Sequence, residues 1–220
     1  MSLHGSTSEV HDRATAQPGS LLAMLDGLRR LKVRAVPLGL KTPLTRLNEH
    51  QFDEMRSLAA SLEIPYRVDA TITPRDDGDL SPLGFRASAD AVRRLYEKVH
   101  EIGELPTAER EEGELNCGLG RVTMAIDSEG SVYPCMQWRH SSFGNVRETS
   151  LRQLWRESRL RKGTADVAHE ANTAIMAIGG ALAKFPFCPA LSMKHAGDPV
   201  VPSAEHREFA AIAESIRDAR

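Results

Sequence analysis

Apolar residues recur at helical spacing in three stretches of the first hundred residues. Ser20 suits a helix N-cap, and the apolar residues that follow it at intervals of three or four are Leu21, Met24, Leu25, Leu28 and Leu31. Asn48 precedes a second stretch, which has Gln51 at the capping-box position and the apolar face Phe52, Met55, Leu58 and Leu62. Ser88 opens the third, with Val92, Leu95, Val99 and Ile102. The spacing predicts three amphipathic helices.

Short runs of β-branched and apolar residues stand between these helices. The segments 1–3, 33–40 and 66–73 each predict a strand, and successive strands start about 32 residues apart, the length of a βα unit. Strands joined by helices are expected to be parallel, with right-handed crossovers. Three units are too few to close a barrel, and they leave one edge of the first strand unpaired. We therefore expect the chain to be the later part of something longer.

The pattern changes at the acidic stretch 106–116, which predicts a solvated linker and a division into domains 1–105 and 106–220. Beyond it apolar residues alternate, and the sequence DSEG at 127–130 suits a hairpin loop in which Gly130 takes a positive φ. A Gly144–Asn145 turn, a helix led by Ser150 with Gln153, a loop at 187–199 and a helix from Ser203 complete the prediction. The second domain is thus a small α+β domain of a hairpin plus helices.

Composition narrows the class of protein. Of 220 residues 41% are hydrophobic and 26% charged, with a net charge of −2 and a pI of about 6.5, an ordinary globular balance. No basic run stands out, so a nucleic-acid partner is not expected. The N-terminus does not resemble a signal peptide, and the longest apolar stretch, 174–185, is too short to cross a bilayer. We expect a cytoplasmic protein without a membrane partner.

The three cysteines carry the candidate chemistry, because a disulfide framework is not expected in the cytoplasm. Cys117 and Cys135 stand at the two ends of the predicted hairpin, with 17 residues between them, and 52 residues separate Cys135 from Cys188. Converging thiolates bind zinc or an iron–sulfur cluster. Free cysteines are also common as small core residues, and no C-x₂-C pair is present. Spacing alone leaves unconnected core thiols and a metal site both open.

The residues around the cysteines resemble a known family. The features that resemble the SPASM/twitch auxiliary-cluster domain of radical SAM enzymes are Cys117, Gly130 separated from Cys135 by four residues, the Gly144–Asn145 pair, the SLRQLW segment and Cys188 with a later Gly197–Asp198. The segment 2–21, with SLHG and HD, is similar to the fourth-strand segment of the radical SAM barrel. The resemblance implies an α/β fold: the C-terminal part of a partial (βα) barrel, with about three parallel units, followed by a SPASM-like domain.

The same resemblance implies a site. It assigns Cys117, Cys135 and Cys188 as ligands of one auxiliary [4Fe–4S] cluster, with His140, His195 or an open position at the fourth iron. It brings Ser2 and His4 near S-adenosylmethionine, although both residues would equally suit capping of the strand-to-loop turn. Asp76, Asp77 and Asp79 are expected in a solvated turn rather than a cation-binding loop. Met136 stands where the sulfatase-maturing branch has an Asp, so that branch's proton transfer is not implied.

The implied activity is that of a radical SAM/SPASM-type maturase acting on a peptide or protein. The CxxxCxxC motif that holds the S-adenosylmethionine-cleaving cluster is absent from this sequence. We therefore expect the chain not to be catalytically competent alone, and to use S-adenosylmethionine only if a separately encoded N-terminal barrel half is supplied. A truncated gene product is a further reading. The alternatives are a non-catalytic peptide- or partner-binding module and a structural zinc-binding protein.

Overall fold

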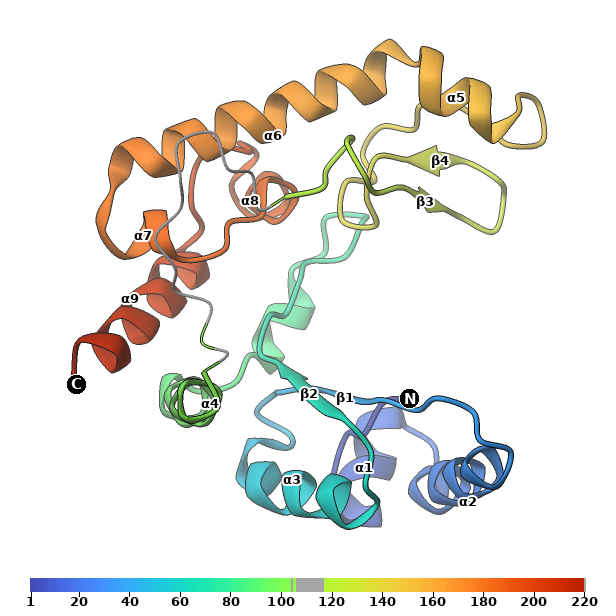
Figure 1. Ribbon diagram of the computed structural model, residues 1–220, viewed down its shortest axis with the longest axis vertical. Helices are drawn as coiled ribbons and strands as arrows, with labels where there is room; N and C mark the ends of the chain where they lie inside the picture. Colours follow the sequence, from blue (N-terminus) through green and yellow to red (C-terminus); the bar gives the residue numbers. More distant parts are fainter. Residues whose placement is uncertain (104, 106–116, 220) are drawn as a thin grey trace. The chain divides into compact units, whose positions relative to one another are not determined.

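The chain forms two compact units in the computed structural model, which describes residues 1–103, 105 and 117–219 (Figure 1). Unit 1 comprises Met1–Thr73 and Leu80–Leu95, and unit 2 comprises Pro74–Asp79 and Tyr96–Arg220. The predicted linker at 106–116 lies outside the described residues. The predicted boundary between residues 105 and 106 stays a prediction.

Parallel strand pairing organises unit 1. Strand β1 (Leu40–Pro43) pairs in parallel with β2 (Tyr66–Asp69), with Leu40 opposite Tyr66. On the other side of β1, Ser2 forms a parallel bridge with Lys41, and the N–H of Leu3 donates to the Lys41 carbonyl at 2.9 Å. The observed pairing has the parallel sense expected of βα units. The extension to a partial barrel stays a prediction.

The second strand lies later in the chain than predicted. The range 33–40 was expected, but α2 (Ser20–Val33) continues through Val33 and the strand begins only at Leu40. Two local features explain the shift: Ala35 takes a left-handed conformation with φ 54°, and Pro37 has no N–H to donate to a ladder. Pairing with the segment at Ser2 then selects Leu40–Pro43 as the strand.

Five further elements complete unit 1: α1 (Ser8–Thr15), the 3₁₀ turns η1 (Glu49–Gln51) and η2 (Ser81–Phe85), α3 (Phe52–Ser61) and α4 (Ala89–Glu101), whose last residues belong to unit 2. The predicted apolar faces supply the core, which buries Leu3, Leu21, Met24, Leu28, Leu40, Met55, Ala59 and Ile64. Helix α1 had no apolar periodicity to predict it. Its Asp12 caps α2, because its carboxylate accepts the N–H groups of Gly19 at 2.6 Å and Leu21 at 2.9 Å.

Asn48 and Gln51 do not form the predicted capping box. The buried Asn48 side chain accepts the N–H of Thr45 at 2.8 Å and donates to the carbonyls of Pro43 and His4 at 3.1 and 3.2 Å. Gln51 instead accepts the Ser6 N–H at 2.9 Å. Both side chains join segments distant in sequence, because those half-buried backbone groups need partners.

Unit 2 combines the predicted hairpin with helices. Strands β3 (Ala125–Ile126) and β4 (Val132–Tyr133) are antiparallel, and Gly130 has φ 90°, as predicted. The helices are α5 (Leu151–Glu157), α6 (Arg159–Ile178), α7 (Gly180–Lys184), α8 (Pro189–Ala196) and α9 (Ala204–Asp218). Ser150 and Ser203 cap α5 and α9 as expected. The predicted loop at 187–199 is wrong over α8, where Pro189 occupies the first helical turn.

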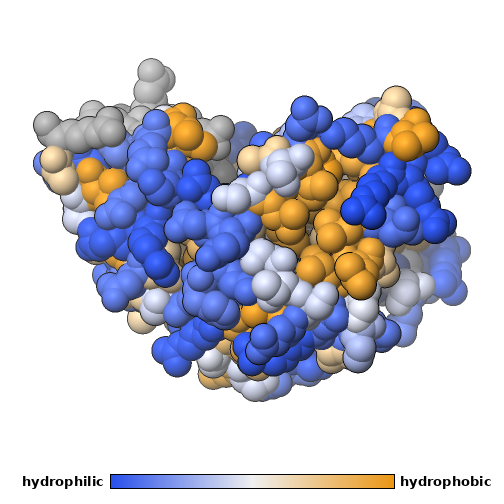
Figure 2. Space-filling model, turned by 90° about the horizontal axis from the view of Figure 1, so that it is seen from below, coloured by the Kyte–Doolittle hydropathy of each residue, from blue (hydrophilic) through white to orange (hydrophobic). Residues whose placement is uncertain are grey.

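The side of unit 1 that carries α1, α2 and α3 has hydrophobic residues gathered in one region of its surface (Figure 2). The large hydrophobic residues that unit 1 exposes include Leu22, Val33 and Val36. No helix within the described ranges is long and apolar enough to span a membrane.

Candidate metal centre

Each of the three cysteines stands at the edge of a different element of unit 2. Cys117 opens the turn that leads toward β3, Cys135 follows β4, and Cys188 is the N-cap residue of α8. All three thiols are free and half-buried. They pack against one hydrophobic cluster of Leu119, Trp138, Ala168 and Ala190. The three cysteines, 18 and 53 positions apart in sequence, thus pack in one neighbourhood, and their role as metal ligands stays a prediction.

The spacing of the three sulfurs differs from that of a single-ion site. Among the residues that the structure describes, no group of three or more His, Cys, Asp and Glu side chains is close enough to hold one metal ion. The cysteines therefore share a neighbourhood without meeting at one point.

Backbone N–H groups face each of the sulfurs. The N–H of Gln137 donates to Cys135 Sγ at 3.3 Å. The N–H of Leu119 bonds to the Cys117 sulfur, and the N–H groups of Leu191 and Ala190 bond to Cys188. In all three cases one donor lies two residues after the cysteine. Such N–H donors stabilise negative charge on sulfur, which is the charge of a metal-bound thiolate.

The surroundings of Cys117 and Cys188 oppose ionisation of these two thiols without a cation. Burial is the main cause that raises the pKa of Cys117 and Cys188, and the neighbouring cysteine charges raise both pKa values further. The N–H bonds to these two sulfurs lower the pKa values but are outweighed. A bound metal cation would reverse this balance, because it favours the thiolate form directly.

A close approach of backbones fixes the turn after Cys117. Gly120 has φ 65°, and a Cβ there would lie 2.6 Å from the carbonyl oxygen of Arg161 on α6. The Arg161 guanidinium donates to the Gly120 carbonyl and lies over the Trp155 ring at 4.6 Å. Glycine is required because no side chain fits between the turn and the helix. The contact seats Leu119, and with it the cysteine cluster, against α6.

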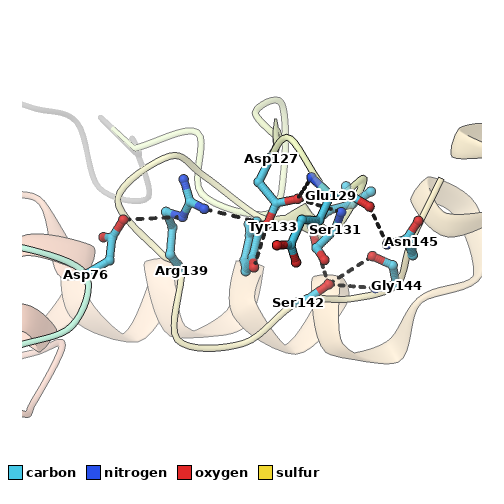
Figure 3. Close-up of polar contacts among 10 residues, drawn as sticks. Asp76, Asp127, Glu129, Ser131, Tyr133, Arg139, Ser142, Gly144 and Asn145 are labelled. Atoms are coloured by element: carbon cyan, nitrogen blue, oxygen red, sulfur yellow. Dashed lines mark hydrogen bonds and ion pairs between the residues drawn. The ribbon is translucent and has the colours of Figure 1, made fainter. Parts of the chain in front are cut away.

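Polar contacts tie the hairpin to its surroundings (Figure 3). Asp127 accepts the N–H groups of Glu129 and Ser131 at 3.0 and 2.9 Å and the Tyr133 hydroxyl at 3.1 Å. Burial would raise the pKa of Asp127, but these bonds and the charge of Arg139 together hold it below its ordinary value. The Arg139 guanidinium also lies over the Tyr133 ring at 4.9 Å.

Asp76 links two of the cysteine-bearing segments. Its carboxylate pairs with Arg139 at 3.4 Å and with Lys194 of α8 at 2.7 Å. Lys194 also donates to the side-chain oxygen of Gln137 at 3.0 Å. Asp76 lies in an exposed turn, as expected, and its carboxylate forms both ion pairs from that turn. The sequence gives no local signal for this link, because its members are separated by up to 118 residues.

The two predicted alternatives for a fourth ligand have different surroundings. The ring of His140 lies against that of Trp138, with centroids 4.3 Å apart, and burial lowers the His140 pKa. His195 directs its Nε2 toward Glu205 on α9 at 4.0 Å. Met136, the residue after Cys135, is exposed.

Ser2 and His4 lie in unit 1, at the end of its first parallel segment. Ser2 is exposed and pairs with Lys41. The backbone N–H of His4 donates to His11 Nδ1 at 3.2 Å, and its carbonyl accepts from Asn48. Burial lowers the His4 pKa, which favours the neutral ring. Their predicted place near S-adenosylmethionine stays a prediction.

Trp138 carries a polar atom that the site leaves unsatisfied. Its side chain is 6% exposed, and its Nε1 has no hydrogen-bond partner among the described residues. The donor set as a whole fits an iron–sulfur cluster: the three thiols pack against the same hydrophobic residues, N–H groups face each sulfur, and a buried indole donor lies beside them.

Comparisons with known proteins agree with this chemistry. Residues 117–177 match the SPASM family model, described as an iron–sulfur cluster-binding domain. The chain is 28% identical over 177 residues to the mycofactocin maturase MftC of Mycobacterium tuberculosis, covering 73% of this chain and 45% of that protein. It is 29% identical over 174 residues to the PqqA peptide cyclase of Rhizobium meliloti, covering 72% and 46%.

These matches confirm the resemblance predicted from the sequence. The chain thus contains a SPASM domain over residues 117–177, and its similarity to the two relatives supports a protein of the radical SAM type. It spans about half the length of the curated relatives it matches. The family match covers Cys117 and Cys135, and Cys188 lies beyond it.

Proposed function

We propose that this chain holds one auxiliary [4Fe–4S] cluster and forms the C-terminal portion of a radical SAM/SPASM-type maturase that acts on a peptide or protein. The observation that carries the proposal is the arrangement of Cys117, Cys135 and Cys188. Their sulfurs pack on one hydrophobic cluster, and each accepts a backbone N–H from the residue two positions later. Core thiols without a ligand have no need of such donors, because a neutral thiol is a weak acceptor.

Each cysteine has a defined part in holding the cluster. Cys117 lies on the turn that Gly120 packs against α6. Cys135 lies on the turn that the backbone N–H of Trp138 closes by donating to the Cys135 carbonyl at 3.2 Å. Cys188 is fixed as the N-cap residue of α8. The bound cluster would supply a one-electron redox centre or a ligand site for substrate. The protein residues position the thiolates, supply N–H donors and exclude water.

Among the candidates for the fourth iron, His140 is the first to test. It lies against Trp138, a member of the same hydrophobic cluster, whereas His195 faces Glu205. His140→Ala should change the spectrum of a bound cluster, and His195→Ala serves as the matched control. An unchanged spectrum in both variants would support the open position.

Anaerobic reconstitution of the purified full chain with iron and sulfide tests the cluster. We expect about four irons and four sulfides per chain, thiolate-to-iron absorption in the visible range, and loss of both after Cys117→Ala, Cys135→Ala or Cys188→Ala. One zinc per chain, with no iron retained, would support the structural zinc protein instead. Absence of any bound metal after reconstitution would contradict both metal readings and leave the non-catalytic binding module.

The peptide substrate and the N-terminal partner belong to the same proposal. The names of the relatives, a mycofactocin maturase and a PqqA peptide cyclase, support peptide modification. The hydrophobic surface of unit 1 supports a protein partner such as a separately encoded barrel half with the CxxxCxxC motif (Figure 2). Supplying that half should also be required for S-adenosylmethionine to bind near Ser2 and His4. Co-purification of this chain with a neighbouring gene product of that kind tests the pairing, and cleavage of S-adenosylmethionine by the chain alone would contradict it.

A further inference from the structure

The indole N–H of Trp138 is a buried donor without a partner among the described residues, and it lies in the hydrophobic cluster that the three cysteines pack against. Trp138 packs with Leu119, Ala168 and Ala190, and the side chains around this group are Cys117, Cys135, Val167, Cys188 and Met193. The side chains of this set that bear any acceptor atom are the three cysteines and Met193. Buried donors without partners are rare in folded proteins, so each one calls for an explanation.

The backbone fixes the ring in this position. The backbone N–H of Trp138 closes the turn after Cys135 by donating to the Cys135 carbonyl at 3.2 Å. In the same turn, the backbone N–H of Gln137 donates to Cys135 Sγ. His140 covers the ring from a centroid distance of 4.3 Å. The indole therefore lies in the same hydrophobic cluster as the cysteines, and its Nε1–H has no partner among the described residues.

A neutral thiol is a poor partner for this donor, whereas a metal-bound sulfur is a good one. Thiolates and inorganic sulfides of a cluster carry negative charge, and hydrogen bonds to charged acceptors are the strong ones. Hydrogen bonds to cluster sulfurs are also one of the ways by which proteins set reduction potential. A donor favours the reduced state, because that state places more negative charge on the sulfurs.

We propose that Trp138 donates its indole N–H to a sulfur of the bound cluster and thereby raises the cluster's reduction potential. This inference rests on the proposed function, since it requires a cluster at the three cysteines. Trp138 is thus a tuning residue that acts on the cluster through one hydrogen bond, and its ring also shields the site from water.

The test compares two single-tryptophan variants of the full chain after anaerobic reconstitution. Trp138→Phe keeps an aromatic ring and removes the N–H. Trp155→Phe is the matched control, because Trp155 stacks on Arg161 and lies outside the cysteine cluster. We expect both variants to keep the iron and sulfide content of the unaltered protein. The potential, measured by an electrode titration with mediators, should become more negative in Trp138→Phe and stay unchanged in Trp155→Phe.

A second measurement tests the inference if Trp138→Phe fails to fold or to bind the cluster. In the Trp155→Phe protein with ¹⁵N-labelled tryptophan, the indole N–H signal belongs to Trp138 alone and should shift or broaden on reconstitution. A loaded Trp138→Phe protein with an unchanged potential, or an indole signal that does not respond to loading, would overturn this inference while leaving the proposed function intact. Failure of the unaltered protein to bind iron would instead refute the proposed function.

Discussion

Replacement of Gly120 by alanine should weaken the packing of the Cys117-bearing turn against α6. Two costs add at this position. A residue with a Cβ at φ 65° is strained by about 1 kcal/mol relative to glycine. The new Cβ would also lie 2.6 Å from the Arg161 carbonyl oxygen and 2.9 Å from the Ala165 nitrogen, whereas ordinary contact begins at 3.4 Å. Both atoms are helix backbone and cannot rotate away.

The size of the effect follows from these two terms. Forcing an extra methyl group into a packed contact costs about 1–3 kcal/mol, so we expect a total loss of about 2–4 kcal/mol in the free energy of unfolding. For a chain of this length each kcal/mol lowers Tm by about 2–4 °C, which gives a decrease of about 5–15 °C. Urea unfolding and thermal melting followed by circular dichroism measure both quantities.

Gly163 offers a matched control on the same helix. It lies exposed within α6, and a Cβ there would meet no other atom within 4 Å. Gly163→Ala should therefore stabilise the protein by about 1 kcal/mol, because alanine is the better helix former. The two substitutions add the same methyl group, but we expect opposite changes in the free energy of unfolding. A Gly120→Ala protein that melts with the unaltered chain would show that the close approach of the turn to α6 is wrong.

Two further predictions concern charge. Asp76→Asn should lower the free energy of unfolding by about 1 kcal/mol, because it removes the ion pairs with Lys194 and Arg139. Asp77→Asn is the control and should change this free energy by less, because it loses only an exposed ion pair with Arg75. Equal effects of the two substitutions in urea titrations would argue against the link. Burial, with a smaller contribution from the charge of His4, lowers the His11 pKa below its ordinary 6.5 despite the opposing effects of Asp12 and of a hydrogen bond with Gly5. The stabilisation from neutral His11 is thus fully present above pH 6.5 and is lost as the pH falls through the folded-state pKa, where protonation of Nδ1 breaks the bond from the His4 N–H. Tm should fall from about pH 7 to about pH 5, and His11→Asn should flatten this dependence, so a Tm fall of the same size in the variant would contradict it.

Local patterns predicted the elements whose partners lie nearby in the chain. The spacing of Leu21, Met24 and Leu28 predicted α2, and Gly130 predicted the hairpin turn. Ser150 and Ser203 predicted the starts of α5 and α9. Each of these depends on contacts three to five residues apart, which the order of residues encodes directly.

Partners distant in sequence decided the features that the patterns missed. Strand β1 lies at Leu40–Pro43 because the segment at Ser2 pairs there. The Asn48 side chain does not form the expected capping box but bonds to three backbone groups. Helix α6 escaped prediction because its buried face consists largely of small and polar residues such as Thr164, Ala168 and Ala171. Such a face is recognisable only once the turn at Gly120 packs on it.

Residue types and motif order were enough to predict the kind of site: three thiols, a hairpin between two of them, and the order of motifs that identifies a SPASM domain. The tertiary structure alone decided that Cys188 packs with the other two, that an N–H faces every sulfur, that Asp76 reaches Lys194, and that an unpaired indole N–H lies among them. The reason is physical. Residue chemistry is carried by each side chain, but burial and convergence depend on which distant segments pack together, and composition and spacing do not encode that.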